Sequence, residues 1–567
     1  GLAGRYVPPN VGNDPIRNPS ALPTGNNFYS FDPRLIPKKE AWNVGKQMVD
    51  ELLRQYKASH NGSYPKKVAF VLWAVETIRH EGIMESEILY LMGVRPVWDS
   101  KGRVKGVSLM NAEDFMLDGD IRPRIDVLVT TSGLYRDTFP DKVKLIDKAV
   151  RLAYDANDTE NYIKMNSDAI YGALNATGNY TSVLLRNFSM ARIFSEAPGT
   201  YGTGLPNAIA ASNTWDNDSK LANLYISRLG YIYGADGWGA QNVDIFRQNL
   251  ANVEVATHSD SSNLYGVLDN DDYFQYLGGL ALAVRSITGK TPDLYVTNLK
   301  NPNNPKTENL NSYLRQEIRA RYFNPKWIKG MMEHDYAGAR EMDKFLEYMW
   351  GWDVTVPDLI TEDMWNEVYD IYIQDKYNLG LKEFFNENNP YALQSMVSRM
   401  LEAERKKYWN PSDEVKTELA KMYDESVKEY DVTCCHHTCA NPFLDEYRKG
   451  ILSAPIKPIK RQITHTYSGG AWRRWKEISE KKAEKNETLI KNETREVTGV
   501  AKTGEELKKP PKKSKEDAEE VVGKVMEKMA SKSSIAFSGV TITGIIVVLI
   551  ILVLIYLGFV SRFKKKM

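Results

Sequence analysis

Apolar residues follow two different spacings in the first part of this chain. Between residues 37 and 59 they recur every three to four positions, which predicts one buried face of a helix. The next segment, "KKVAFVLWAV" (66–75), is continuously apolar, as in a strand covered on both faces. The apolar positions of the helix are Ala41, Val44, Met48, Leu52 and Leu53.

The same alternation continues to about residue 156. Strands are predicted at 93–98, 103–109 and 124–132, and helices at 76–92 and 142–156. Strands that alternate with helices predict an α/β fold with a mostly parallel sheet. We therefore expect an α/β domain over 31–190, followed by a mainly helical α+β region over 191–430.

The remaining segments are distinguished by composition. The first is rich in Pro, Asn and Gly, and we interpret it as an irregular lead-in from a missing N-terminal region. The segment before the apolar C-terminus is rich in Lys and Glu and predicts a flexible, solvated stalk. The expected boundaries are 1–30 for the lead-in, 431–470 for a Cys/His loop region, 471–533 for the stalk, 534–560 for a transmembrane helix and 561–567 for a basic cytoplasmic tail.

The transmembrane prediction rests on one uncharged run, "IAFSGVTITGIIVVLIILVLIYLGFV" (535–560). It is long enough to cross roughly 30 Å of hydrocarbon. The basic sequence "SRFKKKM" follows directly and favours a cytoplasmic C-terminus. We therefore expect a single-pass membrane protein whose body lies outside the cytoplasm.

Charge and motifs exclude two classes of function. The net charge of +1 offers no basic field, so we expect no nucleic-acid partner. "TGKT" (288–291) resembles the end of a phosphate-binding loop, but Val284 stands where that motif needs a glycine. Nucleotide hydrolysis by this chain is therefore rejected.

All three cysteines lie in "DVTCCHHTCANP" (431–442), beside two of the seven histidines. Thiol and imidazole ligands are suited to a borderline or soft metal ion. The spacing supplies only half of a usual zinc site, however, and a disulfide is equally compatible with an oxidising location. Metal contact and disulfide both stay open for this loop. Its candidate metal ligands are Cys434, Cys435, His436, His437 and Cys439.

Several longer stretches carry a resemblance to a known family. They are "LPTGNNFYSFDPRLIP" (22–37), "LYLMGVRPVWDSKGRVKGV" (89–107), "ARIFSEAPGTYGTGL" (191–205), "DSSNLYGVLDNDDYFQYLGGLALAVR" (260–285) and "NPKWIKGMMEHDYAGAREM" (324–342). Together they resemble the large, porphyrin-binding subunit of cobalt and magnesium chelatases, the CobN and magnesium chelatase H family. The resemblance covers roughly residues 1–410.

The resemblance implies that the protein inserts a divalent metal into a tetrapyrrole; Co²⁺ and Mg²⁺ are the expected metals, and iron stays open. It also implies that separate AAA+ ATPase subunits hydrolyse the ATP, which fits the incomplete phosphate loop. The stalk, the apolar C-terminus and the CCHHTC loop depart from the family pattern. They keep open a membrane-anchored tetrapyrrole or haem binder, and a dechelatase that removes metal.

Metal insertion requires a base, because two pyrrole N–H protons must leave the ring. Glu76 and His80 are four residues apart at the start of a predicted helix and follow a predicted strand, where ligands bind in open α/β sheets. The alternative is a solvated first turn. Asp126 is a further candidate, and its alternative is a structural carboxylate beside Arg122 or Arg124.

The metal must be received by ligands that also release it. His258 and Asp260 precede an acidic loop and are our candidates, although such loops are often only solvated or cap a helix. His334 is the third candidate imidazole and is grouped with the catalytic residues. Its segment is equally compatible with helix packing around Gly330 and Gly338.

The macrocycle must be held by its flat face and its peripheral carboxylates, which calls for aromatic and arginine side chains. Arg136 is suited to a bidentate grip on such a carboxylate. An Arg136–Asp137 ion network that shapes the loop is the alternative. The candidate substrate-binding residues are Trp73, Arg136, Asp137, Tyr201, Trp327 and Arg340.

Overall fold

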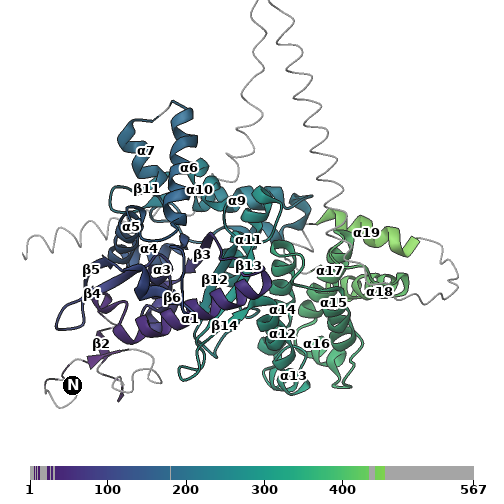
Figure 1. The fold of residues 1–567 in the computed structure, drawn as a ribbon. Helices are drawn as coiled ribbons and strands as arrows, with labels where there is room; N and C mark the ends of the chain where they lie inside the picture. Colours follow the sequence, from purple (N-terminus) through teal and green to yellow (C-terminus); the bar gives the residue numbers. More distant parts are fainter. Residues whose placement is uncertain are drawn as a thin grey trace, which may run out of the picture. The chain divides into compact units, whose positions relative to one another are not determined.

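Residues 32–178, 180–432 and 441–453 are described by the computed structural model, with short pieces before residue 32. They belong to one unit, residues 1–473. Its centre is an eight-stranded sheet in the order β11-β10-β9-β8-β3-β12-β13-β14 (Figure 1). The strands are β3 (Lys67–Leu72), β8 (Asp126–Thr131), β9 (Ile193–Ser195), β10 (Tyr231–Tyr233), β11 (Trp238–Gln241), β12 (Val255–Asp260), β13 (Asp293–Asn298) and β14 (Lys306–Asn309).

The sheet is parallel in its middle and antiparallel at both edges. Neighbouring strands from β9 through β8, β3 and β12 to β13 run parallel. The edge strands β10, β11 and β14 pair antiparallel with their neighbours. The mostly parallel α/β sheet expected from the sequence is therefore confirmed.

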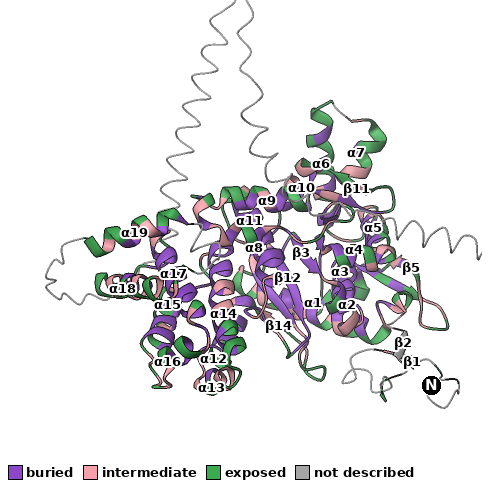
Figure 2. Ribbon diagram, turned by 180° about the vertical axis from the view of Figure 1, so that it is seen from behind, coloured by how far each residue is buried: buried purple, intermediate pink, exposed green. Residues whose placement is uncertain are grey.

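Strand β3 is buried along its whole length, as its continuous apolar run predicts. Val68, Phe70 and Leu72 pack into one apolar core, whereas Ala69 and Val71 pack into a second core on the opposite face. This division follows from the period of two along a strand. Figure 2 shows β3 and β12 buried between flanking helices.

The first predicted helix is confirmed as α1 (Lys39–Ser59). The helix expected over 76–92 is instead two helices, α2 (Ala74–His80) and α3 (Ile83–Leu91). Glu81 and Gly82 between them both have positive φ, and a Cβ on Gly82 would lie 2.6 Å from Pro37. This tight left-handed turn favours glycine and ends α2.

Two of the predicted strands do not join the large sheet. β4 (Val94–Trp98) and β5 (Val104–Leu109) form a separate antiparallel hairpin. Along β4, Val94 and Pro96 are buried whereas Arg95 and Val97 are exposed. This one-sided burial is typical of a hairpin covering a surface rather than of a strand inside a parallel sheet.

The domain boundary expected near residue 190 would divide the central sheet. Strands β9 to β14 all come after residue 190, yet they belong to the same sheet as β3 and β8. Two of them, β9 and β10, have three residues each, too short for a clear periodic signal. The α/β region therefore extends to about residue 309, and continuous helical structure begins only with α12 (Leu310–Ala320).

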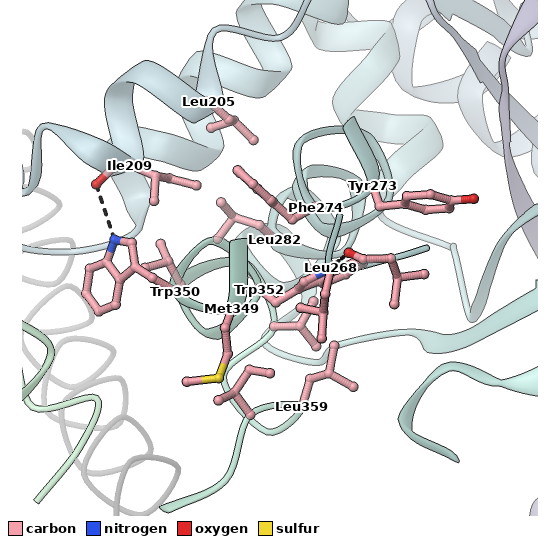
Figure 3. Packing of buried hydrophobic residues seen from close by; sticks show 14 of the residues in the cluster. Leu205, Ile209, Leu268, Tyr273, Phe274, Leu282, Met349, Trp350, Trp352 and Leu359 are labelled. Atoms are coloured by element: carbon pink, nitrogen blue, oxygen red, sulfur yellow. Dashed lines mark hydrogen bonds between the residues drawn. The ribbon is translucent and has the colours of Figure 1, made fainter. Parts of the chain in front are cut away.

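Helices cover both faces of the sheet and continue beyond it (Figures 1 and 2). In the second core, the indole N–H groups of Trp350 and Trp352 donate to the carbonyls of Ile209 (3.5 Å) and Val267 (2.8 Å) (Figure 3). The other α- and π-helices are α4 (Gly133–Thr138), α5 (Pro140–Tyr154), α6 (Tyr162–Ala176), α7 (Ser182–Ser189), α8 (Leu205–Ala210), α9 (Ser219–Leu229), α10 (Val243–Leu250), η5 (Phe274–Gly278), α11 (Gly279–Thr288), α13 (Pro325–Met332), α14 (Asp335–Thr355), α15 (Glu362–Val368), η6 (Tyr369–Ile373), α16 (Leu381–Asn388), α17 (Pro390–Arg405), α18 (Asp413–Tyr430) and α19 (Pro442–Ser453). Short 3₁₀ turns and strand pairs complete the set: η2 (Pro33–Leu35), η3 (Ala112–Phe115), η4 (Ser212–Thr214), β1 (Asn10–Val11), β2 (Asn27–Tyr29), β6 (Met116–Leu117) and β7 (Asp120–Ile121).

The predicted membrane segment, 535–560, lies outside the described residues, as do the predicted stalk and basic tail. Within the described ranges, no helix is both long and apolar enough to cross a bilayer.

Candidate active site

The strand order places a topological switch point between β3 and β12. From β3 the chain proceeds to β8 and β9 on one side, and it then returns to build β12 and β13 on the other side. In open α/β sheets, ligands bind outside the carboxyl ends of the strands at such a point. Helix α2 directly follows β3 there, and a loop from residue 261 to 272 follows β12.

Glu76, in the first turn of α2, lies at the centre of this edge. Its side chain is 1% exposed, and it accepts hydrogen bonds from the hydroxyls of Ser261 (2.7 Å), Ser259 (2.9 Å) and Tyr265 (2.9 Å). Burial raises the pKa of the Glu76 carboxyl, and the nearby Asp260 carboxyl raises it further, against the effect of the three hydroxyls. Three neutral hydroxyls thus surround the Glu76 carboxyl, and the Arg79 guanidinium lies 3.6 Å from its Oε1.

His80 is the last residue of α2 and is also buried. Its Nδ1 accepts the backbone N–H groups of Gly82 (3.2 Å) and Ile83 (3.0 Å). The proton of a neutral His80 ring therefore resides on Nε2. These contacts give His80 a clear part in shaping the turn between α2 and α3, and its catalytic role stays a prediction.

His258, in the middle of β12, packs against Trp73 with ring centroids 4.0 Å apart, and Tyr273 flanks both rings. Nδ1 of His258 lies 2.8 Å from the Val71 carbonyl, so this nitrogen carries the proton. Its Nε2 is buried without a partner among the described residues. Burial lowers the pKa of His258 to about 4, so the ring is a neutral base whose lone pair on Nε2 is available.

Asp260, the last residue of β12, has more strongly stabilising partners than Glu76. It accepts hydrogen bonds from Tyr313 Oη (2.7 Å) and Lys300 Nζ (2.9 Å). Burial raises the pKa of the Asp260 carboxyl, and Lys300 opposes that shift. Lys300 therefore partly neutralises the charge of Asp260, which leaves less of it for an incoming cation.

Sequence reasoning missed Glu196, a third buried acid at this edge. Glu196 follows β9 and accepts hydrogen bonds from Gly202 N (3.0 Å), Ser195 Oγ (2.8 Å) and Tyr276 Oη (2.5 Å). It ties the loop after β9 to the helical turn η5. Its position, one residue past a buried strand, is the same signal that identified Glu76, but β9 is too short to stand out.

Arg136 and Asp137 lie in α4, which follows β8. The buried Arg136 guanidinium donates to the carbonyls of Glu196 and Ala197, both at 2.9 Å, and pairs with Asp137 at 2.7 Å. These are the contacts of a loop-shaping network. Arg136 could bind a ligand carboxylate only if these contacts opened. Its role in substrate binding stays a prediction.

Apolar side chains are exposed after four adjacent strands, β9, β8, β3 and β12, in the loops or helices that follow them. They are Tyr201 (62% exposed), Leu134 of α4 (50%), Val75 of α2 (43%) and Leu264 (88%). Tyr201 is nevertheless fixed, because its hydroxyl donates to Asp137 at 2.9 Å and its ring packs on Gly133, where a Cβ would lie 2.7 Å from the ring.

Asp126 lies at the opposite edge of the sheet, because it begins β8. A strand of six residues separates the two edges by roughly 16 Å. Asp126 pairs with Lys67 (3.1 Å) and Arg192 (2.8 Å), not with Arg122 or Arg124 as we expected. The structure therefore does not bring it together with Glu76.

The expected partners of Asp126 have other roles. Arg124 pairs with Asp158 at 2.8 Å, and Arg122 donates to the carbonyls of Tyr90 and Leu91. Pairing across strands β3, β8 and β9 is a tertiary contact that no local sequence pattern could indicate.

The segment around His334 contains a tight helix contact. A Cβ on Gly338 would lie 1.7 Å from the Met331 carbonyl, so a glycine is required for α14 to cross α13, whereas Gly330 is open. His334 and Arg340 are exposed, and Trp327 packs edge-on against Tyr322 at 5.0 Å. In Figures 1 and 2, α13 lies at the lower edge of the molecule and β3 near its middle.

The loop with Cys434, Cys435, His436, His437 and Cys439 lies outside the described residues, and its role stays a prediction. In the part of the chain that the structure describes, no group of three or more His, Cys, Asp and Glu side chains is arranged to hold a metal ion. The roles of His258 and Asp260 as metal ligands stay predictions.

Comparisons with known proteins agree with this architecture. The family model described as CobN/Magnesium Chelatase matches residues 1–416. An uncharacterized protein of Methanocaldococcus jannaschii is 36% identical over 75% of this chain and 34% of its own length. The aerobic cobaltochelatase subunit CobN of Sinorhizobium sp is 33% identical over 74% of this chain and 32% of its own length.

A solved structure is also similar. The catalytic subunit of cobaltochelatase from Mycobacterium tuberculosis superimposes with a TM-score of 0.68 and 34% identity, over 75% of this chain and 35% of that chain. The chain thus spans about a third of the length of the relatives it matches. It belongs to the CobN/magnesium chelatase family.

Proposed function

We propose that this chain forms part of the large subunit of a metal chelatase, which inserts a divalent cation such as Co²⁺ or Mg²⁺ into a tetrapyrrole. The observation that carries the proposal is Glu76, a carboxyl of raised pKa at the switch point of the sheet, lined by hydroxyls. Family membership supports the same activity.

In this proposal the carboxylate of Glu76 accepts one of the two ring N–H protons and the other passes to water, and the lone pairs left on the ring nitrogens bind the metal. A carboxyl with a raised pKa suits this task, because a general base works best when its pKa approaches the working pH. The unpaired Nε2 of His258 supplies one ligand through which the metal passes, and a single neutral ligand binds weakly enough to release it.

The exposed apolar side chains Val75, Leu134, Tyr201 and Leu264 support a flat, apolar substrate. We propose that they contact one face of the macrocycle, with the fixed ring of Tyr201 as the stacking surface. The N–H groups at the centre of the ring would then face the acidic edge of the sheet.

Separate ATPase subunits of the AAA+ class are the proposed source of ATP hydrolysis. The support is the interrupted phosphate motif, and Gly289 within it has positive φ at the C-terminus of α11. A phosphate-binding loop would instead lead into the N-terminus of a helix.

The test is spectroscopic. The chain is combined with a metal-free porphyrin, Mg²⁺ or Co²⁺, ATP, candidate ATPase subunits and a polypeptide corresponding to the rest of the longer relatives. An ATP-dependent shift of the porphyrin absorbance towards the metallated form is expected. An unchanged spectrum in the presence of every component would refute insertion, and conversion of a metalloporphyrin to the free base would indicate removal.

We also propose that residues 535–560 anchor the chain in a membrane, as their uncharged apolar composition supports. The basic residues 561–567 favour a body on the far side from the cytoplasm. That side lacks cytoplasmic ATP, so orientation decides whether ATPase partners can act. Protease protection of the full chain in sealed vesicles measures it, and release of the chain by carbonate washing would contradict the anchor.

A further inference from the structure

The hydroxyls around Glu76 come from a loop as well as from the sheet. Ser259 belongs to β12, whereas Ser261 and Tyr265 belong to the loop from residue 261 to 272, which connects β12 to η5. The arrangement of donors around Glu76 therefore depends on what holds this loop in place.

One buried carboxylate from another element binds the loop at two amides. Trp352, which donates to the Val267 carbonyl, and Arg321, which pairs with Asp269, also hold it. Glu317, in the helix α12 and 7% exposed, accepts the backbone N–H groups of Val267 (Oε2, 3.1 Å) and Leu268 (Oε1, 3.0 Å). One carboxylate thus satisfies two consecutive amides, an arrangement that fixes both position and orientation. The two amides are only two and three residues beyond Tyr265.

Gly266 makes this contact possible. A Cβ at this position would lie 2.2 Å from Oε2 of Glu317, closer than real atoms approach. Gly266 does not have a positive φ, so the glycine is required by the proximity of Glu317 rather than by backbone conformation. Asp269 Oδ2 accepts the Gly266 N–H at 2.7 Å and closes the turn.

Charge around Glu317 connects it to the site. Lys300 Nζ lies 4.0 Å from Glu317 Oε2 and 2.9 Å from Asp260 Oδ2. Asp260 in turn is the acid whose charge acts on Glu76. Glu317 and Asp260 share one cation, so a change at Glu317 also alters the field at the carboxyl end of β12.

We propose that Glu317 is a positioning residue for Glu76: it binds the amides of Val267 and Leu268 and thereby fixes the loop that presents Ser261 and Tyr265 to the Glu76 carboxylate. The proposal rests on the proposed function of Glu76 as the proton acceptor. Glu317 itself acts through the loop that it binds.

The first experiment measures the loop directly, without activity. Hydrogen exchange is followed at the amides of Val267 and Leu268 in the full chain, for wild type, Glu317→Gln and Gly266→Ala. A glutamine keeps one acceptor oxygen and loses the other, whereas the Cβ of Gly266→Ala displaces the carboxylate. Both variants should lose protection at these amides by about tenfold, the equivalent of one hydrogen bond of about 1.4 kcal/mol.

A matched control is Glu308→Gln. Glu308 lies on strand β14, directly before α12, and accepts a hydrogen bond from the Asn298 side chain at 2.6 Å rather than from the loop. Its replacement should leave the protection of Val267 and Leu268 unchanged. Unchanged protection in Glu317→Gln and Gly266→Ala as well would overturn the proposal.

The second experiment uses the complete chelatase. Glu317→Gln should lower kcat about tenfold and leave KM for the porphyrin unchanged, because the donors around Glu76 are displaced and the outer apolar surface is not. The midpoint of the pH–rate profile that reports Glu76 should also shift, which general loss of stability would not cause. Loss of amide protection with an unchanged kcat and pH profile would overturn the positioning role.

The two proposals fail in different ways. If Glu76→Gln retains full turnover, the proposed role of Glu76 is wrong, yet the exchange result for Glu317 still stands or falls on its own. If Glu76→Gln abolishes turnover and Glu317→Gln changes neither kcat nor the pH profile, only the positioning role is lost.

Discussion

Buried carboxyls lie at both ends of the parallel strands, in different electrostatic surroundings. We call these the amino edge and the carboxyl edge of the sheet. At the amino edge, Asp126 contacts two cations, Lys67 at 3.1 Å and Arg192 at 2.8 Å. At the carboxyl edge, Glu76 is bound by three neutral hydroxyls, and its nearest cation, Arg79, is 3.6 Å away. Burial would raise both pKa values, but the charges of Arg192 and Lys67 lower that of Asp126, whereas that of Glu76 is raised.

The difference separates structure from chemistry. A buried carboxylate between two cations stabilises the fold only as part of its ion network, and it is too weak a base to take a proton at neutral pH. A buried carboxyl among hydroxyls exchanges a proton at little cost to its surroundings. The contacts therefore indicate which of the two acids is suited to proton transfer.

The largest expected effect is the loss of turnover in Glu76→Gln. Glutamine preserves the shape and most hydrogen bonds but cannot accept the proton, so metal insertion should fall by about 10²- to 10⁴-fold. The rate of porphyrin metallation by the assembled enzyme measures it. Glu85→Gln is the control, because Glu85 is buried in the next helix against Thr77 and Tyr135. An equal loss of turnover in Glu85→Gln would mean that the effect is not specific to Glu76.

Asp126→Asn should affect stability instead. The substitution leaves Lys67 and Arg192 buried without a counter-charge, which costs about 3–5 kcal/mol of unfolding free energy. Urea denaturation of the chain measures it. A smaller loss of unfolding free energy in Asp126→Asn than in Glu76→Gln would contradict the proposed difference between the two carboxyls.

Much of the fold could be predicted from the sequence, because long apolar runs and helical spacing are local signals. The continuous run before Trp73 predicted β3, and the spacing over 37–59 predicted α1. The β4–β5 hairpin was misassigned, since a short apolar segment does not reveal which strand it pairs with. The sheet strands after residue 190 were missed because they are short or contain polar residues such as His258 and Asp260.

The site could be predicted only where a residue follows a clear strand. This rule placed Glu76, and the structure shows it beside the end of β12. The partners of Glu76 come from residues nearly two hundred positions away, and Glu317 comes from a helix beyond β14. Such contacts depend on strand order, which the sequence pattern does not contain.

The pH dependence of stability should have opposite slopes for the two acids. The folded-state pKa of Glu76 is raised, so its contribution is fully present below its unfolded value of about 4.5 and is lost as pH rises. Wild type should therefore lose stability relative to Glu76→Gln as the pH rises above about 4.5. The lowered pKa of Asp126 gives a contribution that is present above about 3.8 and is lost as pH falls.

Denaturation at several pH values tests this pair of slopes. Wild type should lose its advantage over Asp126→Asn between pH 5 and 2, in the direction opposite to the Glu76 pair. Slopes of the same sign would show that the surroundings of the two carboxyls do not differ as their contacts indicate.

The smallest expected effect comes from single neutral donors. Tyr265→Phe removes the 2.9 Å hydrogen bond to Glu76 and the hydrogen bond that the Tyr265 hydroxyl accepts from Arg79, and it keeps the ring that packs on Arg79. The lost bond stabilised the ionised carboxylate by about 1 kcal/mol, so the pKa of Glu76 should rise further, by less than about one unit. Asn166→Ala removes the matching neutral donor of Asp126, at 2.9 Å, where two cations remain. The pH-dependent stability should therefore shift measurably in Tyr265→Phe and less in Asn166→Ala. A larger shift in Asn166→Ala would mean that neutral hydroxyl and amide donors, rather than cations, cause the difference in pKa between Glu76 and Asp126.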